Sequence, residues 1–200
     1  MEHSKEFKKE LGRDKLEQGV HLMLEGLQDA YGLDIANENF RETPKRVAKA
    51  YLEMLQGIDT TEVENILKQN FPSDYKGMVI LDKISCYSMC PHHLIPVKYI
   101  IHFGYIPNGN VLGLSKIPRF IKLLAQSPKL QEDFTQEIVK LFNKYVMPEG
   151  SAVVVKGWHG CMGSRGISMP ETATITSEVS GNFQETSVKE EFFKLISTFE

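Results

Sequence analysis

The sequence predicts an α+β protein in which an antiparallel sheet with helices on one face follows a set of N-terminal helices. Apolar residues recur at helical spacing through the first third of the chain, the period becomes that of strands near residue 78, and the later elements follow the order β-β-α-α-β-β-α. The 200 residues, 42% of them hydrophobic and 24% charged, suffice for a core without disulfides. We expect one structural unit, with a helical region over 1–75 and a sheet-bearing region over 76–200.

Three helices are predicted in the N-terminal region. The first carries a stripe of apolar residues that should face a partner: Leu16, Val20, Met23, Leu24 and Leu27. Thr43-Pro44 predicts the start of the second helix, as an N-cap followed by proline, and Gly57 predicts its end. Asp59 and Glu62 have capping-box spacing, so they predict a short third helix through Leu67.

Strands and three further helices are predicted after residue 78. A short apolar run covers 78–81, and a long strand rich in β-branched and aromatic residues covers 97–106. The turn signal at 107–110 predicts that 111–114 returns as its hairpin partner. The remaining elements are expected in the order helix, helix, strand, strand and final helix, over 118–126, 130–145, 151–158, 172–179 and up to Ile196.

Composition and charge exclude several classes of protein. The net charge of −3 gives no basic field for nucleic acid, and no apolar run is long enough for a membrane span. Residues 1–17 hold basic and acidic side chains in equal number, unlike a signal or transit peptide. Three cysteines, an odd number, argue against a disulfide framework and fit a reducing cytoplasm.

Two short motifs carry the residue types that bind zinc. Cys90-Pro91-His92-His93 holds a Cys-x-x-His pair, and Cys161 follows much later in the chain, in His159-Gly160-Cys161. Thiolate and imidazole are preferred zinc ligands, and three of them leave one coordination position for water. The neighbouring His92 and His159 are suited to proton transfer at neutral pH.

Cys86 leaves a second interpretation of these motifs open. It could join Cys90, His93 and Cys161 in a closed Cys3His site, which is structural rather than catalytic. It could also be a small buried apolar residue, as most free cysteines are. The spare histidines beside both motifs favour a catalytic metal.

A second group of polar residues lies where a strand is predicted to end and a helix to begin, in Gly113-Leu-Ser-Lys-Ile-Pro-Arg119. Helix N-termini bind phosphate through free N–H groups and the helix dipole, and Ser115, Lys116 and Arg119 would add a hydroxyl and two charges. An ordinary turn with solvated cations is the alternative, because the segment is not a Walker loop.

Three further residues are weaker candidates. Arg165 follows the second metal motif and offers an anion contact. Glu132, near the start of a predicted helix, can accept two N–H donors of a guanine edge, although the helix dipole alone favours an acid there. Lys49 lies one helical turn from Arg46 on what is most simply a solvated face.

Together these residues resemble the GTP cyclohydrolase I family over about residues 43–196. The carrying segments are Thr43-Pro-Lys-Arg-Val-Ala-Lys49, Ser88-Met-Cys-Pro-His-His-Leu94, Gly104-Tyr-Ile-Pro107, Gly113-Leu-Ser-Lys116 with Arg119, Gln131-Glu132 and His159-Gly-Cys-Met-Gly-Ser-Arg-Gly166. Several independent motifs in the family's order make the resemblance specific.

The resemblance implies a tunnelling fold, with residues 76–200 as its catalytic domain. Units of this fold assemble into rings, typically a decamer of two pentameric rings with sites between subunits. It also implies hydrolytic opening of GTP with formate release and closure of a new ring. The product is 7,8-dihydroneopterin triphosphate, in the first step of tetrahydrofolate and pterin biosynthesis.

The resemblance also implies the role of each candidate residue. Zinc would be bound by Cys90, His93 and Cys161, a ligand set that Fe²⁺ could also occupy. Proton transfer is assigned to His92 and His159. The remaining residues would bind GTP. Glu132 would bind the guanine, and the triphosphate would be bound by Ser115, Lys116, Arg119 and Arg165. Lys49 is a weaker candidate for the triphosphate.

Pro91 is the main departure from the family's pattern. The family usually has Glu at this position, whereas proline has no carboxylate, no N–H and a fixed φ. Pro118 also stands where the family has a small or aliphatic residue. Pro91 keeps one alternative open, namely a tunnelling-fold paralog that runs a different or partial reaction on a purine or pterin. A second alternative depends on Cys86 as a fourth ligand, namely a non-catalytic ring stapled by zinc.

Overall fold

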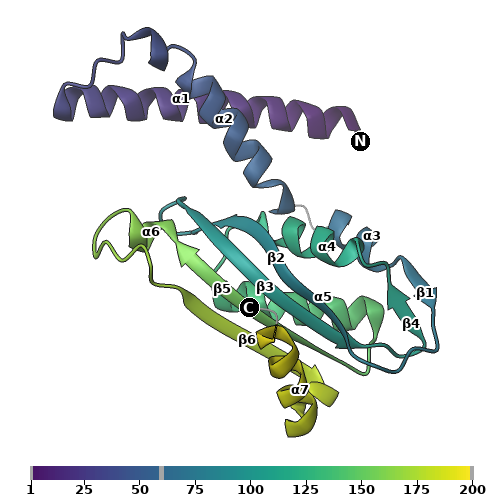
Figure 1. Cartoon of the computed structure of the whole chain (residues 1–200). Coiled ribbons are helices and arrows are strands. Elements are labelled where there is room, and N and C mark those ends of the chain that lie inside the picture. The colour runs from purple at the N-terminus through teal and green to yellow at the C-terminus, as the bar shows by residue number, and fades with distance from the viewer. Residues whose placement is uncertain (1, 59–60, 199–200) are drawn as a thin grey trace. The chain divides into compact units, whose positions relative to one another are not determined.

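The computed structural model describes residues 2–58 and 61–198, which form two compact units, Met1–Leu55 and Gln56–Glu200 (Figure 1). The first unit is helical. Its long helix α1 (Glu2–Tyr31) packs against α2 (Thr43–Met54), and the short helix η1 (Glu38–Phe40) lies between them in the sequence. Leu24 is the one buried member of the predicted apolar stripe.

The ends of α2 differ from the sequence prediction. The helix includes Thr43, so Glu42 is its N-cap, and it ends at Met54 rather than at Gly57. Gly57 instead lies in the short helix η2 (Gln56–Ile58), where its N–H donates to the carbonyl of Gln126 at 3.2 Å. A Cβ at Gly57 would overlap the carbonyl oxygen of Leu123, so this glycine permits a close backbone approach. The predicted cap at Asp59 lies outside the described residues.

The second unit is built on a four-stranded antiparallel sheet in the order β2-β3-β5-β6. The strands are β2 (Val79–Met89), β3 (Pro96–Ile106), β5 (Gly150–His159) and β6 (Thr174–Gly181). One face is covered by α4 (Lys116–Ala125) and α5 (Gln131–Val146), which bury an apolar core against it. The predicted α+β class and the β-β-α-α-β-β order are therefore confirmed.

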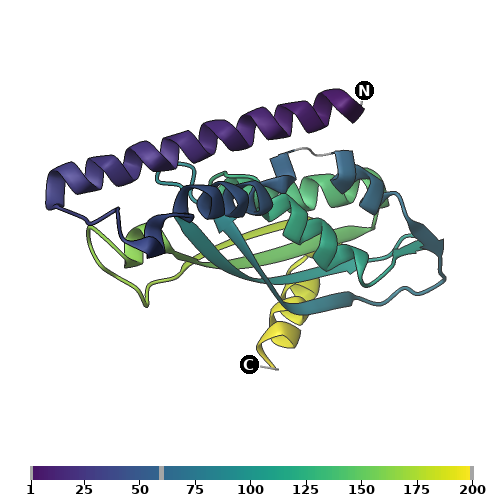
Figure 2. The ribbon, with the colours of Figure 1, turned by 90° about the horizontal axis from the view of Figure 1, so that it is seen from above.

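A second, smaller core covers the other face of the sheet. After β6 the chain forms η3 (Asn182–Gln184) and α7 (Thr186–Ser197), which project from the side opposite α4 and α5 (Figure 2). Phe192 of α7 packs over Gly104 of β3, where a Cβ would approach its ring to 2.9 Å. This arrangement leaves the ends of the strands available for loops that carry functional residues.

The predicted hairpin of 97–106 with 111–114 is wrong. The segment after β3 forms the short strand β4 (Asn110–Leu112), which pairs with β1 (Asn70–Pro72) in a separate two-stranded sheet. The partner of β3 is β2, where the apolar pattern is interrupted by a bulge. Lys83, with φ of 53°, lies in that bulge, and beyond it Ile84 and Cys86 alternate with exposed residues as in a strand with one buried face.

Residues 56–75 fold with the sheet rather than with the N-terminal helices. The short helix α3 (Thr61–Leu67) contributes Val63, Ile66 and Leu67 to the core that α4 and α5 form against the sheet. The chain therefore divides after Leu55, earlier than the boundary expected at 75/76.

Helix α4 begins at Lys116, two residues before the predicted start. Pro118 is then the third helical residue, where the missing N–H costs nothing because the first N–H groups of a helix have no partner within it. Across the described residues, none of the helices combines the length and apolar character that crossing a bilayer requires.

Candidate metal centre

A tight loop between β2 and β3 brings Cys90 and His93 to the same side of the chain. The Leu94 N–H donates to the Cys90 carbonyl at 2.9 Å, and the Cys90 N–H donates to the Ile95 carbonyl at 3.0 Å. Leu94 has a left-handed φ of 51°, as residues that end a helical turn commonly do. Pro91 takes the first position of this turn, where the restricted φ of proline is favourable. The turn therefore tolerates the proline that replaces the family's Glu.

The second half of the centre comes from the end of β5. His159 is the last residue of β5 and pairs with Val97 near the start of β3, so the segment after it returns to the loop at residues 90–95. This segment forms the single-turn helix α6 (Gly160–Gly163), which carries Cys161. A Cβ at Gly160 would lie 2.7 Å from the Pro96 carbonyl oxygen, so glycine is needed for this close approach.

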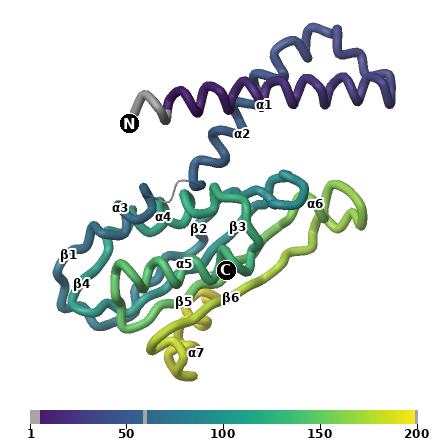
Figure 3. Tube along the Cα trace, turned by 180° about the vertical axis from the view of Figure 1, so that it is seen from behind, coloured from purple at the N-terminus to yellow at the C-terminus, as the bar shows by residue number. Residues whose placement is uncertain are grey.

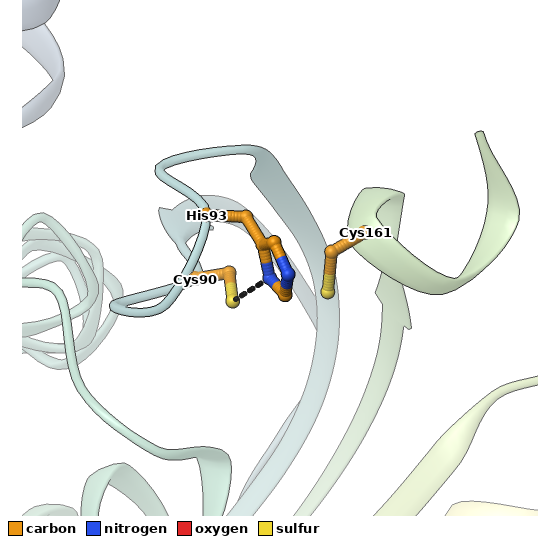
Figure 4. Close-up of side chains that lie close together, drawn as sticks. All are labelled: Cys90, His93 and Cys161. Atoms are coloured by element: carbon orange, nitrogen blue, oxygen red, sulfur yellow. Dashed lines mark hydrogen bonds between the residues drawn. The ribbon is translucent and has the colours of Figure 1, made fainter. Parts of the chain in front are cut away.

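The three predicted ligands meet at this end of the sheet, where His93 lies between the two cysteines (Figure 4). One ligand atom from each of Cys90, His93 and Cys161 lies within 4.8 Å of the other two. The Cys90 Sγ is 3.7 Å from the His93 Nδ1. Bond lengths of about 2.3 Å for Zn–S and about 2.0–2.1 Å for Zn–N separate two tetrahedral ligands by roughly 3.6 Å. The spacing and the donor set thus fit a zinc ion.

The thiol of Cys161 is hard to ionise without a cation. Burial raises its pKa, and the neighbouring Cys90 raises it further, while Arg165 acts in the opposite sense. A divalent cation stabilises thiolates and displaces their protons on binding. A metal ion that binds Cys161 therefore displaces the proton of a thiol whose pKa is raised.

Cys86 does not belong to this centre. It lies on β2 in the main core, and burial raises the pKa of its thiol to about 12. The described residues that could hold a metal together are Cys90, His93 and Cys161, with Cys86 outside the group. The structure therefore does not support the closed Cys3His site, and Cys86 is a buried apolar residue.

Both predicted proton-transfer residues lie beside the ligands. The Nδ1 of His92 is 3.8 Å from the Cys90 Sγ, on the exposed side of the loop. His159 is half-buried, and burial lowers its pKa although the charge of Glu132 acts in the opposite sense. Glu132 follows Gln131, the residue at the start of α5 whose side chain contacts His159.

Gln131 is a site residue that sequence reasoning missed. Its side chain is buried, and its Oε1 lies 2.9 Å from the Nε2 of His159. In the sequence it stands out only as part of the Gln131-Glu132 pair, with no role of its own. The role of a buried amide at the first position of a helix depends on its tertiary contacts, which the sequence does not show.

The predicted phosphate-binding residues Ser115, Lys116 and Arg119 lie toward the other end of the sheet. They follow β4, which with β1 lies at the end away from α6 (Figures 1 and 3). A Cβ at Gly113 would lie 3.5 Å from both the Lys116 side chain and the ring of Phe71 in β1. The chain therefore does not gather these cations around its own metal centre.

The two remaining candidates are exposed. Arg165 follows shortly after α6, the helix that carries Cys161, and its charge lowers the pKa of the Cys161 thiol. Lys49 belongs to the first unit, where its Nζ is 3.9 Å from the carboxylate of Glu53 on the same helix.

Replacement of Pro91 by alanine is expected to weaken zinc binding. Proline at a compatible turn position stabilises the folded loop by about 0.4–1 kcal/mol, so the dissociation constant should rise about two- to fivefold. Competition with a chromophoric chelator measures this change. Pro128→Ala, between α4 and α5, is the matched control and should leave the affinity unchanged. Equal affinities of the wild type and Pro91→Ala would show that proline does not preorganise the loop.

Comparisons with known proteins agree with the resemblance seen in the sequence. The GTP cyclohydrolase I family model matches residues 18–197. GTP cyclohydrolase 1 of Clostridium perfringens is 39% identical over 188 residues, which cover 94% of this chain and 99% of the relative. The enzyme of that name from a Hydrogenobaculum species is 40% identical over 189 residues, covering 93% and 98%.

Among solved structures, a crystal structure of the archaeosine synthase QueF-Like in the apo form is similar over 52% of this chain and 94% of that chain. The TM-score is 0.43 and the sequence identity is 20%. The assignment of a family depends instead on the sequence matches, which span nearly the whole chain and include both metal motifs. By these matches, the chain belongs to the GTP cyclohydrolase I family.

Proposed function

We propose that this GTP cyclohydrolase uses zinc, held by Cys90, His93 and Cys161, to open GTP with release of formate and closure to 7,8-dihydroneopterin triphosphate. The observation that carries the proposal is the convergence of these three ligands from two distant segments. When bound, zinc lowers the pKa of water to about 7 and supplies a nucleophile at neutral pH. Fe²⁺ accepts the same ligand types.

Other side chains of the chain would transfer protons and bind the guanine and the phosphates. His92 and His159 hold and return protons as the imidazole ring of GTP opens, a role that suits imidazoles next to the reacting atoms. Glu132 accepts N–H donors of the guanine edge and orients the ring. Arg165 binds phosphate oxygens from the exposed side of the centre. Lys49, which belongs to the first unit, is a weaker candidate for a triphosphate contact.

A neighbouring subunit would supply the other phosphate contacts. Ser115, Lys116 and Arg119 lie toward the β1–β4 end, away from their own chain's metal centre. Among the described residues, the outer strands β2 and β6 have a partner strand on one side only. Long open edges favour pairing with another chain, and β2 of one copy is antiparallel to β6 of the next when the sheets join. We propose a ring, with a decamer of two pentamers as the expected assembly.

Metal analysis combined with an assay of both products tests the proposal. The purified protein should hold about one zinc per subunit, as a single three-ligand site implies. Incubation with GTP should release formate and pterin in equal amounts, the pterin being read by fluorescence after oxidation. Accumulation of an opened formamide species, without formate or pterin, would indicate a paralog that stops after ring opening. A zinc-loaded ring that releases no formate would contradict the proposed activity.

A further inference from the structure

The side chain of Gln131 is held in place by three contacts of its amide nitrogen with the sheet. It is the first residue of α5 and is only 2% exposed. Its Nε2 lies 3.1 Å from each of three acceptors, the carbonyls of Val155 and Thr174 and the hydroxyl of Thr176. These contacts join the start of α5 to both β5 and β6.

The contacts fix which way the amide faces. A backbone carbonyl can only accept a hydrogen bond, so the NH2 group of Gln131 must face Val155 and Thr174, because the amide oxygen carries no hydrogen. The Oε1 therefore faces His159, whose Nε2 lies 2.9 Å away. Since Oε1 can only accept, the hydrogen bond requires the proton of the imidazole to be on Nε2.

The fold makes specific room for this amide. Gly157 of β5 lies opposite Tyr99 of β3, and a Cβ at Gly157 would overlap the Oε1 of Gln131. The Tyr99 ring is also edge-on to His159, with centroids 6.4 Å apart. Glycine at one position and a flat ring at the other leave a slot that holds both the amide and the imidazole.

We propose that Gln131 is a positioning residue, which holds the His159 ring through its Nε2–H in the orientation that GTP opening requires. The inference rests on the proposed function, because the residue that Gln131 orients takes part in that reaction. Gln131 acts through His159 and through the start of α5, where Glu132 follows it.

The tautomer of His159 in the assembled wild-type enzyme is the first test. Histidine-selective ¹⁵N labelling distinguishes a protonated from an unprotonated ring nitrogen, and a His159→Gln variant identifies the signal among the six histidines. The inference expects the proton on Nε2. A proton on Nδ1 would overturn it without any variant of Gln131.

Replacement of Gln131 by leucine should remove the hydrogen bond that orients the imidazole of His159. The ¹⁵N signals of His159 should move toward a mixture of tautomers. The kcat should fall about 10- to 100-fold, as with other groups that orient a reacting imidazole, while KM for GTP changes far less. Gln131→Glu keeps an oxygen that can accept from Nε2, so it should keep the tautomer. It loses the amide hydrogens that contact the Val155 and Thr174 carbonyls, so it should recover only part of the kcat.

Asn143→Leu is the matched control. Asn143 is also an amide of α5, and it bridges the Ser151 and Ser180 hydroxyls of β5 and β6 at 2.7 Å each, at the end of the sheet away from His159. It should lose stability but keep the tautomer and the kcat. Equal effects of the two leucine variants would mean that Gln131 is merely structural. Failure of the proposed function is distinct, because a zinc-loaded wild type would then release no formate whatever tautomer it holds.

Discussion

Cys161→Ala is expected to lose nearly all zinc and, with it, the opening of GTP. Two ligands remain in one short loop, and they cannot hold a catalytic ion at neutral pH when the third is lost. The formate release rate should fall by roughly a thousandfold or more, since the nucleophile depends on the bound cation. Metal analysis after gel filtration and a formate assay measure the two losses separately.

Cys86→Ala provides the control for this variant. The change is identical in chemistry, but Cys86 lies in the core and outside the metal group. It should cost about 1–2 kcal/mol of stability through the cavity it leaves, while zinc content stays unchanged. If Cys86→Ala also removed zinc, or if Cys161→Ala kept both zinc and activity, the assignment of the three ligands would be wrong.

The metal centre can be predicted from sequence because its chemistry is local. Cys90 and His93 lie one helical turn apart, and few residue types other than cysteine and histidine bind zinc with this preference. The return of Cys161 to them depends on the register of β3 with β5, which periodicity does not determine. The place of Cys161 in the site follows from the resemblance. In the structure, the pairing of His159 with Val97 and the close approach at Gly160 bring Cys161 to the loop that holds Cys90 and His93.

Other features could not be predicted, and each has a physical cause. Strand β2 is visible in the sequence only as a short apolar run, because a bulge with Asp82 and Lys83 breaks its alternation. The return strand over 111–114 is assigned the wrong partner because a turn signal does not show which neighbouring strand completes the ladder. Gln131 has no recognisable role in the sequence because its partners lie on β5 and β6, far along the chain.

The separation of the metal centre from Ser115, Lys116 and Arg119 has a consequence for assembly. If a site takes its metal from one subunit and these cations from the next, neither half is sufficient, and activity requires the ring. A subunit defective in one half can then still lend the other half to its neighbour. This arrangement makes a quantitative prediction about mixed assemblies.

Rings assembled from a 1:1 mixture of Cys161→Ala and Lys116→Ala subunits are expected to recover about one quarter of wild-type activity, because each shared site combines its two halves at random. Either variant alone should be nearly inactive, because Cys161→Ala lacks the metal and Lys116→Ala binds the triphosphate less tightly. The mixture is made by unfolding and refolding the two chains together, and the formate release rate is compared with that of wild type treated in the same way.

A site contained within one chain would give a different result. Every subunit in the mixture would carry one defect, so no complete site would form and the activity would stay at the level of the two parents. Mixing each variant with itself controls for losses in refolding. The recovered activity is also expected to depend on the mixing ratio. It should be highest when the two variants are present in equal amounts, since the product of their two fractions is then largest. A peak of this kind cannot arise from residual activity of either parent, and so it would assign the cations of α4 to the metal centre of a neighbouring subunit.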